Sequence, residues 1–196
     1  MLIFCAMKTQ SWSENQTARI GREVRRLRDA RGWSAQRLAD RTRELGYQVT
    51  RTVISDVEIG RRQQLSVAEM TVLARALDTS PAALMYPAPE GIVEVLPGVE
   101  VSEIRAAQWF SGLLDGSSAE VHSLFDDPVV YGRNLKRLRL ARKIWDLEEN
   151  KVSMMAARAA EPKGGRGPWT EMITGIQREI AEATRELRSE YDDAQR

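Results

Sequence analysis

The segment RTVISDVEIGRR, residues 51–62, carries side chains that could bind the edges of DNA bases. Arginine can donate two hydrogen bonds to guanine, threonine and serine can bond a base or touch a thymine methyl group, and aspartate can accept from the cytosine amino group. Four such residues share one face at helical spacing: Arg51, Thr52, Ser55 and Asp56. Aliphatic residues occupy the opposite face. We therefore expect a short helix whose aliphatic face packs in the core and whose polar face is exposed to solvent.

Five short helices are predicted around this segment, in residues 17–88. Apolar side chains recur there at helical spacing, and serine, threonine or proline stands where each later helix begins. The expected helices run from Thr17 to Arg31, Ser34 to Leu45, Thr50 to about Gly60, Ser66 to Leu77, and Ser80 to before Pro87. A tight turn joins the second helix to the third. This arrangement is a helix-turn-helix, whose second helix enters the major groove of DNA.

Other polar residues of this region are candidates for binding the phosphates of a duplex. Arg61 and Arg62 follow the third helix, where guanidinium groups can bind phosphate oxygens. Gln36 and Arg37, at the start of the second helix, and Thr50, at the start of the third, complete this predicted set.

The simpler interpretation of residues 51–56 is an ordinary helix face in contact with water. Asp56 in particular could be a capping or intrahelical partner, because its charge repels phosphates.

The order of several short motifs in residues 17–86 resembles the Cro and phage-repressor helix-turn-helix family, often called XRE-like. The matching pieces are LR, RGWS, LA, VTR, IS, EIGR and LARAL, which begin at residues 27, 31, 38, 49, 54, 58 and 73. The resemblance implies a five-helix DNA-binding domain that usually acts in transcriptional repression. It also implies a structural ion pair between Glu58 and an arginine of the first helix, Arg28.

Two features depart from the pattern of that family. Many members carry glutamine directly after the serine that opens the second helix, whereas this chain has Ala35 there and Gln36 next. The connection from the second helix to the third is also a few residues longer. Together with the later segment LPGVEV, this longer form is similar to regulators of actinobacteria and their phages.

Charge divides the chain into three blocks. Residues 17–88 hold 13 Lys and Arg against 8 Asp and Glu, residues 89–128 hold 1 against 8, and residues 129–196 hold 14 against 11. The middle block contains a Pro-Gly turn between aliphatic runs. We therefore expect an acidic connector with a short β-hairpin and a helix at 89–128.

A long helical hairpin is predicted for residues 129–196. Its second helix, from about Pro168, has a coiled-coil seam formed by Trp169, Ile173, Ile176, Ile180, Ala183 and Leu187. In the first helix, from about Pro128 to Ala160, the stripe expected to face this seam consists of Tyr131, Leu135, Leu138, Trp145, Val152, Ala156 and Ala159. A second stripe is left over: Leu140, Ile144, Leu147, Met154 and Met155. The surplus predicts a partner for the hairpin, either the N-terminal domain or a second copy of the chain.

A second basic run begins the first long helix of this hairpin. Its candidate residues are Arg133, Lys136, Arg137 and Arg139. They could form a second DNA contact, or a solvated face balanced by glutamates of the last helix.

The sequence therefore predicts an all-α protein in several parts: a flexible tail at 1–16, a helix-turn-helix domain at 17–88, the acidic connector and the helical hairpin. One cysteine and one histidine leave no metal cluster, no catalytic constellation emerges, and no cofactor is expected. No targeting or membrane-spanning run is seen, which favours the cytoplasm.

The predicted function is sequence-specific binding of a duplex DNA operator by a transcriptional regulator, most simply a repressor. The predicted assembly is a homodimer through the C-terminal helices. Two alternatives stay open: a monomer on an asymmetric site, and an antitoxin or other regulator whose C-terminal helices bind a protein partner.

Overall fold

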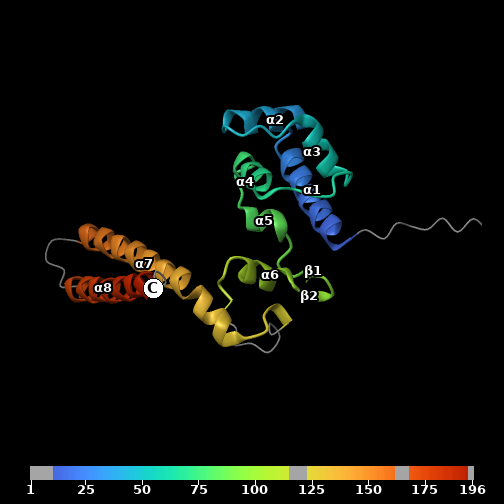
Figure 1. The fold of residues 1–196 in the computed structure, drawn as a ribbon. Coiled ribbons are helices and arrows are strands. Elements are labelled where there is room, and N and C mark those ends of the chain that lie inside the picture. The colour runs from blue at the N-terminus through green and yellow to red at the C-terminus, as the bar shows by residue number, and fades with distance from the viewer. Residues whose placement is uncertain (1–10, 115–122, 162–167, 194–196) are drawn as a thin grey trace, which may run out of the picture. The chain divides into compact units, whose positions relative to one another are not determined.

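The computed structural model describes residues 11–114, 123–161 and 168–193, and the chain divides after Leu114 into two compact units (Figure 1). The first unit contains five helices followed by a β-hairpin and a sixth helix. These elements are α1 (Trp12–Ala30), α2 (Ala35–Glu44), α3 (Arg51–Glu58), α4 (Val67–Ala76), α5 (Pro81–Met85), β1 (Ile92–Leu96), β2 (Val99–Ser102) and α6 (Glu103–Phe110). The second unit contains α7 (Pro128–Ala160) and α8 (Trp169–Asp193). The predicted fold class is thus confirmed, including the hairpin and the long C-terminal helix pair.

Hydroxyl side chains begin the first five helices. In each, a serine or threonine oxygen accepts a hydrogen bond from the backbone N–H three residues later, which satisfies one of the free donors at the helix start. The capping residues are Ser11, Ser34, Thr50, Ser66 and Ser80. Two of these helices end at glycines with positive φ, Gly32 after α1 and Gly60 after α3. Because these caps depend on local sequence alone, the predicted boundaries of α2 to α5 are close to the observed ones.

The predicted start of the first helix is wrong. Thr17 is the expected first residue, yet α1 begins at Trp12, and only residues 1–10 of the predicted tail lie outside the described residues. Ser11 and Glu14 form a reciprocal capping box, and the Trp12 indole donates a 3.0 Å hydrogen bond to the Glu94 carbonyl. The sequence signature Ser-x-x-Glu could have identified this start.

The β-hairpin and α6 pack within the first unit, although the sequence assigns them to a separate connector. The strands are antiparallel, and Val93 stands opposite Val101 with both side chains buried. Glu103, at the start of α6, is also buried, and its carboxylate accepts a 2.6 Å hydrogen bond from the Ala88 backbone N–H. The connector region therefore extends the core of the helical domain.

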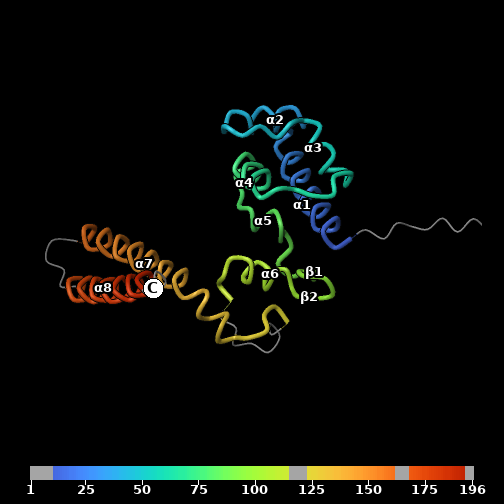
Figure 2. The backbone as a smooth tube through the Cα atoms, in the orientation of Figure 1, coloured from blue at the N-terminus to red at the C-terminus, as the bar shows by residue number. Residues whose placement is uncertain are grey.

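The second unit is an antiparallel pair of helices, whose backbone path is clear in Figure 2. Lys136, near the start of α7, binds Glu186 and Glu190, near the end of α8. The predicted seam of α8 faces inward, and Ile176 and Ala183 on it are buried. Residues 162–167 of the predicted turn lie outside the described residues.

The predicted seam of α7 is wrong, because the other stripe faces α8. Beyond the half-buried Tyr131 and Leu135, the predicted seam residues Leu138, Trp145 and Val152 are exposed, whereas Leu140, Ile144, Leu147, Lys151 and Met154 are half-buried. Arg142 and Glu149 interrupt the predicted stripe, and Lys151 lies within the observed one. A lysine can lay its aliphatic stem along an apolar surface while its amine stays polar, and here that amine pairs with Glu148.

Every helix in the described ranges is either too short or too polar to cross a lipid bilayer.

Replacing Gly21 by alanine should destabilise the first unit. A Cβ at this position would lie 2.1 Å from the Val57 carbonyl oxygen, so α1 and α3 would have to separate. We expect a loss of about 3 kcal/mol in the free energy of unfolding, measured by urea denaturation. Gly175→Ala in α8 is the matched control, because its Cβ would meet no atom within 4 Å, and it should be stabilising by about 0.5–1 kcal/mol. Equal stability of wild type and Gly21→Ala would contradict this packing.

Candidate nucleic-acid interface

Helix α3 exposes a polar face to solvent, and its opposite, apolar face is buried in the domain. Arg51 and Thr52 are exposed, and Ser55 and Asp56 are half-buried on the next turn. Behind them, Ile54 and Val57 are almost completely buried. The four predicted base-reading residues are therefore brought together on one short helix. The apolar side chains fix the helix in the domain, so its polar face has one orientation.

A buried threonine organises the turn that leads into α3. The Thr42 hydroxyl donates a 2.8 Å hydrogen bond to the Ala39 carbonyl and accepts a 3.0 Å bond from the Val49 backbone N–H. Thr50 then caps α3 by accepting from the Val53 N–H. Thr42 was missed in the sequence, although it lies at helical spacing within the apolar stripe of its helix. Its contacts place the start of α3 relative to α2.

The ion pair that the resemblance implies connects α1 to the end of α3. Arg28 donates from Nε and Nη2 to the two carboxylate oxygens of Glu58, at 2.6 and 2.7 Å. The side chains are only 11% and 7% exposed. Hydrogen bonding to Glu58 raises the pKa of Arg28 despite its burial. Arg28 also donates to the Trp33 carbonyl, so one guanidinium joins α1, α3 and the loop before α2.

The two arginines after α3 have different surroundings. Arg61 is exposed, whereas Arg62 donates to the Gln64 carbonyl and pairs with Glu69 at 2.8 Å. Burial by itself raises the pKa of Glu69, but hydrogen bonds from Ser66 and the charge of Arg62 hold that pKa below its usual value. Arg62 therefore connects the loop after α3 to the capping box of α4.

Polar side chains also gather at the start of α2. Gln36 donates to Asp40 at 3.1 Å, and Arg37 pairs with Glu44 at 3.2 Å. The Arg37 guanidinium also lies 5.5 Å from the centre of the Trp33 ring, a distance typical of a cation–π contact. Sequence reasoning did not identify Trp33 as a positioning residue. Both Gln36 and Arg37 are exposed, so phosphate oxygens could replace their present partners.

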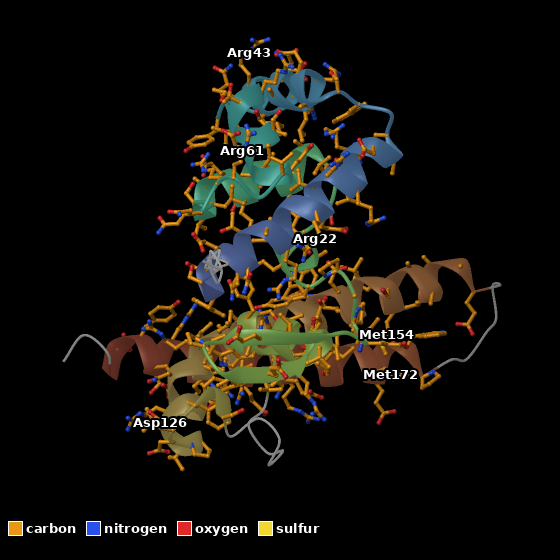
Figure 3. The ribbon with its side chains drawn as sticks, turned by 90° about the vertical axis from the view of Figure 1, so that its right-hand side faces the viewer. Arg22, Arg43, Arg61, Asp126, Met154 and Met172 are labelled. Atoms are coloured by element: carbon orange, nitrogen blue, oxygen red, sulfur yellow. The ribbon has the colours of Figure 1, made fainter. Side chains whose placement is uncertain are left out.

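Arg22 and Arg43, which the sequence analysis did not single out, lie with Arg61 on the surface of the same unit. Figure 3 marks Arg43 on α2, Arg61 after α3 and Arg22 on α1. All three are exposed, and Arg43 pairs with Asp40 at 2.9 Å. They add positive charge to the unit that carries α3, which favours association with a polyanion.

The second basic run lies on α7, and several of its members have partners within the second unit. Lys136 binds Glu190 and Glu186 at 2.6 and 3.0 Å, and these bonds raise the pKa of Lys136. Arg137 lies 4.6 Å from the ring centre of Tyr191, and Arg139 lies 5.9 Å from that of Tyr131. Arg133 is exposed. Glutamates of α8 thus balance part of this run, which was one of the two interpretations of the sequence.

The five N-terminal helices and the exposed start of α3 define a helix-turn-helix domain. Residues 19–85 match a family model described as "Helix-turn-helix domain", which supports assignment of this region to a DNA-binding family. No curated protein and no solved structure matches the chain.

Breaking the Arg28–Glu58 pair should destabilise the first unit strongly. Glu58→Ala leaves a mostly buried guanidinium without its carboxylate, which costs about 3–5 kcal/mol in the free energy of unfolding. The double variant Arg28→Ala/Glu58→Ala should lose less than the sum of the two single losses, because no uncompensated charge remains. Urea denaturation of the four proteins measures this coupling. Strictly additive losses would mean that the pair makes no energetic contribution.

Proposed function

We propose that this protein is a transcriptional regulator that binds a specific sequence of duplex DNA and represses the promoter there. One observation carries the proposal: α3 exposes Arg51 and Thr52 at its N-terminal end while Ile54 and Val57 hold the opposite face in the core. A recognition helix contacts bases from this end when it lies in the major groove.

The base contacts divide along α3. Arg51 and Thr52 extend furthest into solvent, so they bind base edges most directly. Arg51 has the geometry to donate two hydrogen bonds to a guanine, and Thr52 offers a methyl group and a hydroxyl. Ser55 and Asp56 are half-buried on the following turn and contact the adjacent base pair.

The phosphate contacts come from residues on either side of α3. Arg61 is exposed immediately after it, and Gln36 and Arg37 are exposed at the start of α2. Thr50 caps α3, where backbone N–H groups favour an anion. Arg62 supports this surface through Glu69 rather than by gripping phosphate, which changes the role that the sequence predicted for it.

Repression follows from the position of such a domain on DNA. A domain in the major groove of a promoter prevents polymerase from occupying the same base pairs. Selection of tight-binding duplexes from a random pool, followed by transcription from a promoter that carries the selected site, tests both steps. The expected result is one enriched motif and reduced transcription with added protein. Enrichment of no motif would contradict specific binding, and a motif without reduced transcription would contradict repression.

Arg51→Ala should relax the sequence preference at one base pair. Loss of a two-bond contact to guanine costs about 1–3 kcal/mol on the selected site and much less on a site altered at that base pair. Fluorescence anisotropy with both duplexes measures the difference. Arg178→Ala is the control, because Arg178 is an exposed residue of α8, and this variant should bind both duplexes as wild type does. Unchanged affinity of Arg51→Ala for the selected site would contradict the proposed docking.

Arg61→Ala and Arg62→Ala should have different effects, because Arg61 is exposed whereas Arg62 pairs with Glu69. Arg61→Ala should weaken binding to all duplexes alike and reduce the slope of log affinity against log salt by about 1. Arg62→Ala should chiefly lower the melting temperature, since it removes the partner of Glu69. Anisotropy across a salt series and thermal denaturation separate the two. A reduced salt slope for Arg62→Ala alone would reverse these assignments.

A further inference from the structure

A polar cavity lies between α1 and the β-hairpin, within the first unit. Its volume is about 350 Å³, which lies in the range of sites for small molecules. On α1, Trp12, Arg19 and Arg22 stand seven and three residues apart, so they share one helical face. These three side chains line the cavity together with Ile92 and Glu94 of β1 and Glu103 of α6.

Two hydrogen bonds from α1 to β1 fix the frame of the cavity. The Trp12 indole donates to the Glu94 carbonyl at 3.0 Å, and the Gln16 side-chain amide donates to the Val95 carbonyl at 3.4 Å. Because both acceptors belong to the backbone of β1, the first turns of α1 stay beside this strand. The cavity therefore lies between two elements that are held together.

Arg19 has hydrogen-bond donors with no acceptor. Its Nε and Nη2 atoms are shielded from solvent and have no hydrogen-bond partner among the described residues. Burial lowers the pKa of Arg19, and the negative charge of Glu103 opposes this effect. The Tyr86 ring, whose centre is 5.3 Å from the guanidinium carbon, stabilises the charge but accepts no N–H···O bond. Buried donors of a charged group are costly to leave unpaired, so this guanidinium favours an added acceptor.

Arg22 places a second positive charge beside the first. It is exposed, it lies one turn further along α1, and its charge adds to the effect of burial in lowering the pKa of Arg19. The two carboxylates of the cavity already have donors, since Glu103 and Glu94 each accept from a backbone N–H, at 2.6 and 2.7 Å. A water molecule would supply an acceptor, but an anion would also offset the repulsion between the two arginines.

We propose that the cavity binds a small organic anion whose carboxylate or phosphate group lies between Arg19 and Arg22. On binding, Arg19 turns its unpaired donors toward the cavity and forms charge-assisted hydrogen bonds with the anion. Trp12 and Ile92, which is 67% exposed, provide an apolar wall for the rest of the ligand. The site is built from α1, β1 and α6 rather than from α3, so it stands or falls separately from DNA binding.

Titration of the full chain with benzoate and with phenyl phosphate tests the proposal, at constant ionic strength and without inorganic phosphate. The two probes share a phenyl ring, so they distinguish a carboxylate site from a phosphate site. Wild type is expected to bind at least one of them with a dissociation constant of about 1 mM or below. In amide and guanidinium NMR spectra, the Arg19 Nε–H signal should show the largest shift. Benzyl alcohol, the uncharged probe, should cause no saturable shift.

Three variants assign the site to its residues. Arg19→Met should abolish binding, and Arg22→Gln should weaken it about 10-fold or more, because it removes a charge-assisted contact. Arg25→Gln is the matched control, since Arg25 is exposed on the same helix but pairs with Asp29 and lies outside the cavity, and this variant should bind as wild type does. Circular dichroism verifies that all three variants keep their helices.

The outcomes are distinct. Saturable binding of benzoate alone identifies a carboxylate ligand, binding of phenyl phosphate alone identifies a phosphate ligand, and binding of both supports a site for either group. Binding of neither anion at about 10 mM would overturn the proposal. Equal binding of benzyl alcohol, or an Arg22→Gln variant that binds the anions as wild type does, would overturn it as well.

Discussion

The contact between α1 and α3 is the constraint on which the proposed DNA-binding surface depends. At one point the contact is steric, since Gly21 lets the α1 backbone approach the Val57 carbonyl. At another it is ionic, since Arg28 holds both carboxylate oxygens of Glu58. A short helix of eight residues has little stability of its own, so it needs tertiary contacts to persist. The Gly21 contact, the Arg28–Glu58 pair and the buried Ile54 hold α3 in place. The helix can therefore stay folded while its polar face is exposed.

The rest of the first unit supports this contact. Thr42 fixes the chain that enters α3, and Arg62 connects the chain that leaves it to Glu69 at the start of α4. The β-hairpin receives the N-terminal end of α1 through the Trp12 indole. The acidic segment after α5 thus lengthens the core of the helical domain, through the Glu94 carbonyl that accepts from Trp12 and the Glu103 carboxylate that accepts from the Ala88 backbone N–H.

The sequence predicted correctly those elements whose boundaries depend on interactions between residues close in the chain. Caps such as Ser34, Thr50 and Ser66 and the Pro-Gly turn act within a few residues, so the positions of α2 to α5 and of the hairpin followed from the sequence. The Arg28–Glu58 pair followed only from the family resemblance, because thirty residues separate its members. The start of α1 was missed although its capping box is local. Thr42 and Trp33 were missed because their roles depend on which loop folds against them.

The α7 seam shows what periodicity alone cannot decide. Helix α7 carries apolar residues on two faces, and both recur at coiled-coil spacing. The observed face accommodates the stem of Lys151, whereas Glu149 of the predicted face is exposed. The face that α8 leaves exposed carries Trp145.

The central claim is that α3 binds DNA through its exposed face. Backbone amide NMR spectra of the full chain, recorded with and without a selected duplex, test it most directly. The account predicts that the largest chemical-shift changes fall on α3, the start of α2 and Arg61, with small changes on the buried side of α1. Changes confined to α7, or spread evenly over the chain with none concentrated on α3, would contradict it.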